Sequence, residues 1–305
     1  GVLDANGHPY PYNLAVKNSA FLMTADGILA DDCSPTLVGS YAPVGSKPVN
    51  APCTVSISGG SFAAAGNGSG LDHGIYIDRV DQLTVTNSLF LGGFDGHLLK
   101  SRALNTDIET TRLIDGPLGL SNSLIDIPVG GNLTLKGSTL EVGPYNYNGF
   151  INYSEEAWPP TPNNPGRTIA ITGNTFIDDY SGSSNYTTIA LWDDSLDTGK
   201  TAPLTHAPAG SVANTTITGN HFFGPKWTTA NLIATGDTKN GGPGAAPTHP
   251  VVDASNTVAA TGAPALDMTS PVTWPTGTAM QTLDVTMNGF CIPANNDGAA
   301  PYTCP

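Results

Sequence analysis

Apolar and polar positions recur in a six-residue pattern along most of this chain. The pattern reads apolar, polar, small, then Asn, Ser, Gly or Thr, then any residue, and finally Phe or Leu. The copies VKNSAF, ISGGSF, VTNSLF, IETTRL, LKGSTL, ITGNTF and ITGNHF end at Phe21, Phe62, Phe90, Leu113, Leu140, Phe176 and Phe222, and weaker copies end at Val258 and Phe290. Each copy predicts a strand, a tight turn and a second strand, because apolar residues alternate and Gly or Asn tolerates the left-handed conformation of the turn.

The spacing of the copies predicts a solenoid. The shortest spacings are 23 residues, from Phe90 to Leu113, and 27 residues, from Leu113 to Leu140. A second ladder, formed by GIYID, HLLKSR, LIDIPV and FINYSE, precedes the first by about 15 to 25 residues, such as the 15 residues from Ile75 to Phe90, and IALWDD, LIATGD and ALDM continue it at longer distances. Stacked repeats need this regularity, and stacked turns let an Asn bond its neighbour in the next coil. We expect an all-β, single-domain right-handed parallel β-helix of about nine coils, with at least two strands per coil, over residues 1–305.

Stretches without the pattern are predicted loops and a cap. They are rich in Gly and Pro, which interrupt regular structure. Loops on one side of a solenoid commonly form the walls of a binding groove. The predicted loops span residues 31–54, 155–168, 195–213 and 236–250, and the predicted C-terminal cap spans residues 291–305.

Composition and charge narrow the possible partners. The chain carries a net charge of −14 with 12% charged residues, so nucleic acid and anionic membranes are poor partners. It has no apolar stretch long enough to span a bilayer. No motif indicates a metal or another cofactor, and calcium stays an open alternative. Either a monomer or a trimer agrees with the sequence.

The four cysteines form two sequence-local pairs, Cys33 with Cys53 and Cys291 with Cys304. Neither pair has the C-x-x-C spacing of a zinc or redox site. Two disulfides that close short loops are therefore predicted, each stabilising the fold by roughly 2–3 kcal/mol. Disulfides form in oxidising compartments, so we expect a secreted or periplasmic protein.

A cluster of cations stands out in so acidic a chain. We align the second ladder on its inward residues Ile75, Leu99, Ile125 and Ile151. The outward row is then Tyr76, Lys100, Asp126 and Asn152, with neighbours about 4.8 Å apart. His73 and His97 begin two of these strands, and Arg102 follows Lys100 by two residues.

Two interpretations of this cluster stay open. In the first, the cations only pair with nearby carboxylates, among them Asp78 and Asp126. In the second, they bind an anionic sugar, because an Arg fork such as that of Arg102 fits a uronate carboxylate. Lys100 or His97 would then remove a proton, and Tyr76 or the other base would protonate the leaving oxygen. His73, Asn152 and Trp192 are further candidates for contact with the sugar.

Carboxylates support a rival chemistry. Asp126 is expected within one or two coils of Glu156 and Asp194. Inverting glycoside hydrolysis needs two carboxylates roughly 6.5–9.5 Å apart, which stacked coils can supply. A non-catalytic carbohydrate-binding or adhesion solenoid is the alternative outside enzymology.

Three segments resemble a group of bacterial right-handed parallel β-helix repeat proteins. They are Asp72-His73-Gly74-Ile75-Tyr76, Gly96-His97-Leu98-Leu99-Lys100-Ser101-Arg102-Ala103 and Ile125-Asp126-Ile127-Pro128-Val129-Gly130-Gly131. The group's motifs are G-H-G-I-Y and G-H-H-I-K-S-R-A. This chain departs from them at two positions, with Asp72 in place of the first Gly and Leu98 in place of the second His. The wider superfamily is similar to pectate lyases, and the resemblance implies carbohydrate as the ligand without choosing the reaction. The cation cluster, rather than the resemblance, makes a polysaccharide lyase acting on a uronate-containing glycan our first expectation.

Overall fold

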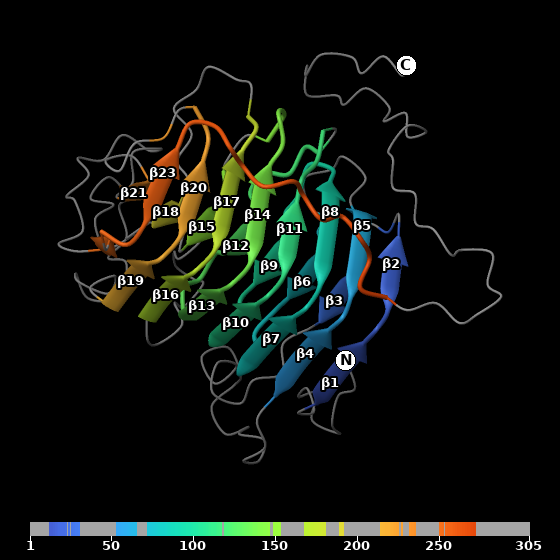
Figure 1. Ribbon diagram of the computed structural model, residues 1–305. Helices are drawn as coiled ribbons and strands as arrows, with labels where there is room; N and C mark the ends of the chain where they lie inside the picture. The colour runs from blue at the N-terminus through green and yellow to red at the C-terminus, as the bar shows by residue number, and fades with distance from the viewer. Residues whose placement is uncertain are drawn as a thin grey trace, which may run out of the picture.

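The chain forms three parallel β-sheets that lie along a common axis (Figure 1). The computed structural model describes residues 12–22, 24, 26–30, 53–65, 72–117, 119–146, 149–153, 168–180, 189–191, 214–225, 227, 232–235, 250–252 and 254–272. In this part of the chain the regular secondary structure consists of β-strands and includes no helix, which confirms the all-β class. Successive strands enter the first, second and third sheet in turn, so the order is consistent with a parallel β-helix.

Each sheet takes every third strand of the chain until the last, incomplete circuit. The first sheet contains β1 (Asn13–Lys17), β4 (Thr54–Ser58), β7 (Gln82–Thr86), β10 (Asn105–Glu109), β13 (Asn132–Lys136), β16 (Thr168–Thr172), β19 (Asn214–Thr218) and β22 (Pro250–Val252). The second contains β2 (Ala20–Leu22), β5 (Ser61–Ala65), β8 (Leu89–Gly93), β11 (Arg112–Ile114), β14 (Thr139–Val142), β17 (Thr175–Asp178), β20 (His221–Phe223) and β23 (Thr257–Ala259). The third contains β3 (Ile28–Ala30), β6 (Ile75–Ile77), β9 (Leu99–Ser101), β12 (Ile125–Ile127), β15 (Ile151–Tyr153), β18 (Ile189–Leu191) and β21 (Ile233–Thr235).

The six-residue pattern marks the turn from the first sheet to the second, as predicted. The third residue of seven copies has a positive φ between 48° and 65°: Asn18, Gly59, Asn87, Thr110, Gly137, Gly173 and Gly219. Gly and Asn suit this left-handed conformation, because crowding at Cβ disfavours it for other residues. Thr110 is the exception in the column, a β-branched residue at φ 50°.

The last position of the pattern builds the core beneath the second sheet. The rings of Phe21, Phe62 and Phe90 stack with centroids 5.0 and 4.6 Å apart, and those of Phe176 and Phe222 stack at 4.7 Å. Apolar residues of all three sheets join these rings in one buried cluster along the axis. The repeated apolar positions of the sequence thus become a continuous core.

The fourth position of the pattern forms a buried polar ladder. The side-chain oxygen of Asn220 accepts hydrogen bonds from the backbone N–H and from the side-chain amide of Asn174, both at 2.9 Å. Asn256 accepts the equivalent pair from Asn220 at 3.0 and 2.9 Å. The predicted bonding of Asn residues between neighbouring coils is confirmed for these three residues.

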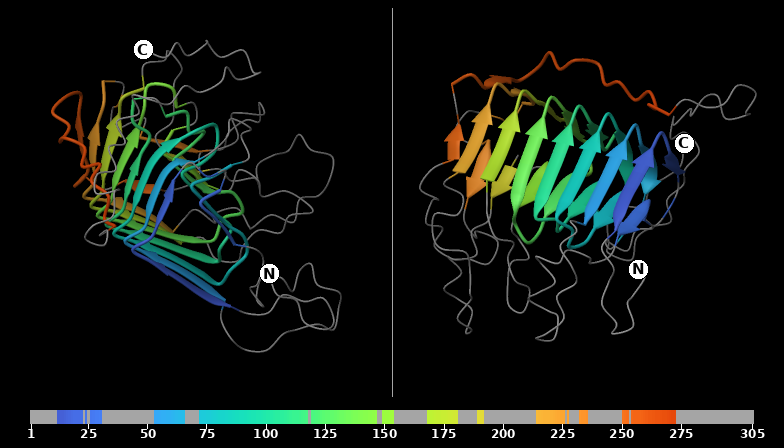
Figure 2. Two further views of the ribbon diagram at one scale, coloured as in Figure 1. Left: turned by 90° about the vertical axis from the view of Figure 1, so that its right-hand side faces the viewer. Right: turned by 90° about the horizontal axis from the view of Figure 1, so that it is seen from below.

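After β23 the chain turns back and runs along the outer face of the second sheet, as residues 260–272 (Figures 1 and 2). We call this segment the strap. Leu266 packs against an apolar cluster that includes Leu91 and Ile114. The prediction that ALDM, residues 265–268, continues the second ladder is therefore wrong: this segment forms no strand and contacts β11 instead. Leu266 thus contacts the outside of the sheet, whereas Met268 is exposed.

Most of the predicted loops and the predicted cap lie outside the described residues. Three of the predicted loop ends are wrong, because Thr54, Thr168 and Pro250 begin β4, β16 and β22. Cys53 is buried, whereas Cys33, Cys291 and Cys304 are not among the described residues, so both disulfides stay predictions. The pattern copy ending at Phe290 is also outside, and the count of nine coils stays a prediction.

Candidate functional site

The predicted outward row lies on the third sheet with the expected register. Tyr76 pairs with Lys100, Lys100 with Asp126, and Asp126 with Asn152 on neighbouring strands β6, β9, β12 and β15. The flanking residues point inward because they are apolar, and Ile75, Leu99, Ile125 and Ile151 are fully buried. The row therefore lies along the axis of the solenoid, one residue per coil.

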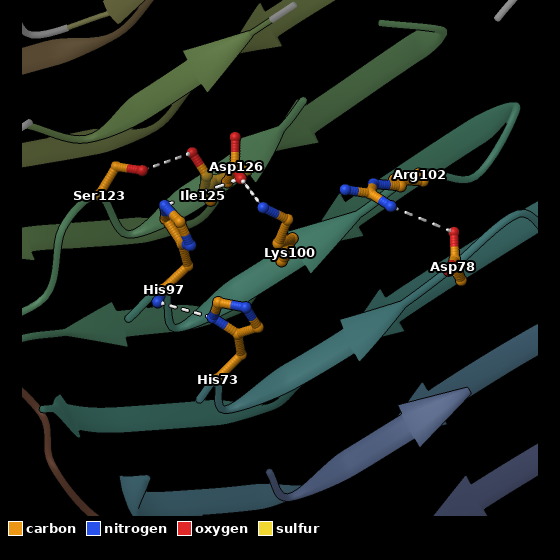
Figure 3. A network of polar contacts seen from close by, with 8 residues as sticks. All are labelled: His73, Asp78, His97, Lys100, Arg102, Ser123, Ile125 and Asp126. Carbon is orange, nitrogen blue, oxygen red and sulfur yellow. Dashed lines mark hydrogen bonds and ion pairs between the residues drawn. The ribbon is translucent and has the colours of Figure 1, made fainter. Parts of the chain in front are cut away.

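Asp126 is the centre of the charged contacts in this row (Figure 3). Its Oδ2 lies 3.0 Å from Nζ of Lys100 and 3.7 Å from Nε2 of His97. The exposed fractions of the Lys100 and Asp126 side chains are 9% and 3%. A buried carboxylate at 3.0 Å stabilises the ammonium form of the lysine. Lys100 is thus an ion-paired cation.

The two histidines of the cluster are in direct contact. The backbone N–H of His97 donates to Nδ1 of His73 at 3.1 Å, and the ring centroids lie 5.1 Å apart. Both side chains are largely buried. The chain is tight here, since a Cβ on Gly96 would come within 1.6 Å of the backbone oxygen of Asp72. The Gly-His sequence at residues 96–97 therefore places His97 two residues before β9, without room for a larger residue at position 96.

Tyr76 and Arg102 form the more exposed part of the site. Nη1 of Arg102 lies 3.9 Å from Oδ1 of Asp78, with about a quarter of each side chain exposed. The Arg102 guanidinium is 5.4 Å from the centre of the Tyr76 ring, and Lys100 Nζ is 5.8 Å from it. A half-buried aromatic ring between two cations favours their charged forms. Arg102 therefore combines a fixed charge with access to solvent.

The other predicted contacts of the site divide into two groups. Asn152 is buried in the row next to Asp126. Glu156, Trp192 and Asp194 are outside the described residues, so the carboxylate pair that inverting hydrolysis needs has no measured separation here. Among the described residues no group of three His, Cys, Asp or Glu side chains could hold a metal ion.

A second polar cluster is not predicted by the sequence pattern. Asp115 and Glu141 are both buried beside the second sheet, at the turn toward the third. Ser121 Oγ donates to Asp115 Oδ1 at 2.6 Å, and the backbone N–H of Gly116 donates to Glu141 Oε2 at 2.7 Å. The one signal in the sequence is a Glu at an outward position that the neighbouring strands fill with Ile114 and Ile177.

Burial dominates the electrostatics of this second cluster. Desolvation raises the pKa of Glu141 to about 8, against the opposing hydrogen bond from Gly116, and the nearby carboxylates of Asp115 and Asp179 raise it further. Burial also raises the pKa of Asp115, although hydrogen bonds from Ser121 and Asn146 oppose the shift. Glu141 is therefore a protonated acid at neutral pH.

Comparison with known proteins finds no matching family model, no matching curated protein and no matching solved structure. In the part of the chain that the structure describes, no helix is long and apolar enough to cross a membrane.

Proposed function

We propose that this chain is a secreted or periplasmic polysaccharide lyase that cleaves a uronate-containing glycan at the outer face of the third sheet. In this proposal the scaffold is a right-handed β-helix of about nine coils, similar to the pectate lyase superfamily. The single observation that carries the proposal is the contact of Asp126 with both Lys100 and His97, beside Arg102. This arrangement places the cations Lys100 and Arg102 and the titratable base His97 on one face of an acidic protein.

Arg102 and Lys100 supply the positive charge that a uronate needs. Arg102 is partly exposed and presents a planar fork of donors to the sugar carboxylate. Lys100, which lies in β9 two residues before Arg102, adds a second positive charge. Neutralising the carboxylate acidifies the adjacent C–H bond, which lowers the barrier to removing its proton.

His97 is the better placed of the two candidate bases. The ammonium of Lys100 holds its proton against Asp126 at 3.0 Å, whereas the His97 imidazole is 3.7 Å from the same oxygen. A carboxylate at that distance stabilises the imidazolium that forms when His97 takes a proton. Asp126 therefore assists the base without touching the sugar.

The elimination step balances without a cofactor. His97 takes the proton from the carbon next to the carboxylate, and the electron pair of that C–H bond forms a carbon–carbon double bond. The glycosidic C–O bond at the neighbouring carbon breaks, and the leaving oxygen receives a proton from the Tyr76 hydroxyl. The products are one chain with a new reducing end and one with an unsaturated terminal uronate.

A non-catalytic carbohydrate-binding solenoid is the second candidate. The low exposure of His97, Lys100 and Asp126, at 7%, 7% and 2% of each whole residue, favours it, because groups so buried meet a ligand only over a small area. In that case Arg102 and Tyr76 would bind the sugar without reaction.

The experiment is a panel of acidic and neutral polysaccharides, with reducing ends and ultraviolet absorbance followed together. Elimination predicts that both signals rise with an acidic glycan. Reducing ends without absorbance would overturn the lyase in favour of hydrolysis, for which Asp126 with Glu156 or Asp194 would be the first residues to replace. Binding of a glycan without either signal would support the second candidate.

A further inference from the structure

The contact between the two histidines determines the protonation of His73. Its Nδ1 lies 3.1 Å from the backbone nitrogen of His97. A backbone N–H only donates, so Nδ1 of His73 must present a lone pair. The proton of the neutral ring is then on Nε2. His73 is therefore held in one tautomer by the backbone N–H of His97.

The surroundings of His73 fix its ring in place. The residue as a whole is 4% exposed. Its backbone N–H donates to Oδ1 of Asp26 at 2.9 Å, which ties it to the preceding coil. Its ring meets the Tyr76 ring edge-on at 5.4 Å. A buried ring in contact with the rings of Tyr76 and His97 offers its Nδ1 as a rigid acceptor.

That acceptor acts on the backbone of His97, whose side chain reaches Asp126 (Figure 3). His97 lies two residues before β9 and is joined to His73 by this bond across neighbouring coils. If the acceptor were missing, a buried N–H would lose its partner, and the backbone would shift to recover one. The imidazole of His97 would move with it.

We propose that His73 is a positioning residue of the site: its neutral, Nε2-protonated imidazole holds the backbone of His97 so that the His97 ring stays against Asp126. The inference deepens the proposed function and rests on it for the role of His97 as base. It replaces the expectation that His73 binds the sugar.

The test is nitrogen NMR of the imidazoles at pH 8 in the full chain. His73 is expected to show an unprotonated Nδ1 and a protonated Nε2. His73→Asn keeps an acceptor near the place of Nδ1, whereas His73→Phe keeps the ring size without an acceptor. The His97 amide and ring resonances should stay close to wild type in His73→Asn and move in His73→Phe. His221→Asn, at an exposed position in β20, is the matched control and should leave His97 unchanged.

An Nδ1-protonated His73 would overturn the proposal, as would His97 resonances that stay unchanged in His73→Phe or move equally in both variants. If His73→Phe does not fold, the proposal is tested by the tautomer of His73 in wild type and by the His97 resonances in His73→Asn. On a cleaved glycan, kcat/KM should fall about 10–100-fold in His73→Phe and stay within a few-fold of wild type in His73→Asn. The NMR results need no substrate, so a chain without lyase activity but with the expected spectra contradicts the proposed function and not the role of His73.

Discussion

Lys100 and Asp126 form an ion pair between adjacent coils, with Nζ 3.0 Å from Oδ2 and both side chains buried. Each charge depends on the other, because a buried charge without its partner is costly. The same pair lies in the centre of the proposed site. It therefore links the stability of the third sheet to the chemistry of its outer face.

The two members of this pair are expected to be coupled, so that removing both costs less stability than the two separate losses added together. Lys100→Met should lower the free energy of unfolding by about 3–5 kcal/mol, since it leaves the Asp126 carboxylate buried without its ammonium. Lys100→Met with Asp126→Asn should be less destabilised than the sum of the single variants. Urea unfolding measures the four free energies of the cycle.

The control cycle is Arg102→Met with Asp78→Asn, a pair at 3.9 Å and a quarter exposed, for which at most about 1 kcal/mol of coupling is expected. Additive effects in the buried pair would refute its coupling.

Thr110 occupies a turn position that suits Gly or Asn. Its φ of 50° is the left-handed conformation, in a column otherwise formed by Gly and Asn. Thr110→Asn should stabilise the chain by about 1 kcal/mol, because it relieves crowding at a β-branched Cβ. Thermal unfolding measures the gain. The neighbouring Thr111→Asn is the control: its hydroxyl accepts the backbone N–H of Ser88 at 3.5 Å, so no gain is expected there. A lower melting temperature for Thr110→Asn would contradict the strain argument.

Glu141 should make the fold less stable as pH rises. Its pKa is about 8 in the folded chain and 4.5 without the fold, so the folded state binds more protons between these values. The stabilisation is therefore complete below pH 4.5 and is lost as pH rises toward 8. Glu141→Gln stays neutral at all these pH values. The melting temperature of wild type minus that of this variant should therefore fall from pH 5 to pH 8, because only wild type loses stability as Glu141 ionises. Glu109→Gln, on the outer face of the first sheet, is the control and should show a nearly constant difference. A constant difference for Glu141→Gln would mean that Glu141 ionises normally in the fold.

The strap is expected to depend on Arg112. The guanidinium donates to the backbone oxygens of Asp267 at 2.8 Å and Thr269 at 2.7 Å and also contacts the Asp267 carboxylate. Arg112→Met removes these bonds while keeping a side chain of similar length, so residues 260–272 should be cleaved faster in limited proteolysis. Mass spectrometry of the fragments locates the cuts. Lys136→Met, at an exposed position in β13, should leave the cleavage rate unchanged. Equal protection of the strap in both variants would show that Arg112 does not hold it.

The register of the third sheet is predictable because its inward positions are apolar and its outward positions in the site are mostly polar or charged. Ile75, Leu99 and Ile125 fit only the core, so aligning these residues in the sequence places Lys100 beside Asp126, as the strand pairing confirms. The turn column is predictable for the same kind of reason, because Gly and Asn recur at one position of the repeat.

Contacts between distant segments cannot be inferred from the pattern. ALDM has the alternation of a strand, but the packing of Leu266 and the bonds from Arg112, 155 and 157 residues away in sequence, place it on the outside of the second sheet. The protonated Glu141 is unpredictable for a related reason: its pKa depends on burial that the sequence does not reveal. The sequence predicts the row of the site and leaves the pairing of its cations with carboxylates such as Asp126 as one of two open interpretations. Only the distance of 3.0 Å between Lys100 and Asp126 shows that Lys100 is ion-paired and therefore a poor base.

The most direct test of elimination at this site is the ultraviolet absorbance of a uronate polymer incubated with wild type, His97→Gln or Arg102→Gln, with Asp107→Asn on the first sheet as the control. We predict a steady rise with wild type and with Asp107→Asn. We predict at least a 100-fold slower rise with His97→Gln, since a general base contributes about 10²–10⁴ to the rate, and a loss of similar order with Arg102→Gln. Undiminished absorbance with folded His97→Gln and Arg102→Gln, or the absence of any rise with wild type across uronate polymers, would contradict the account.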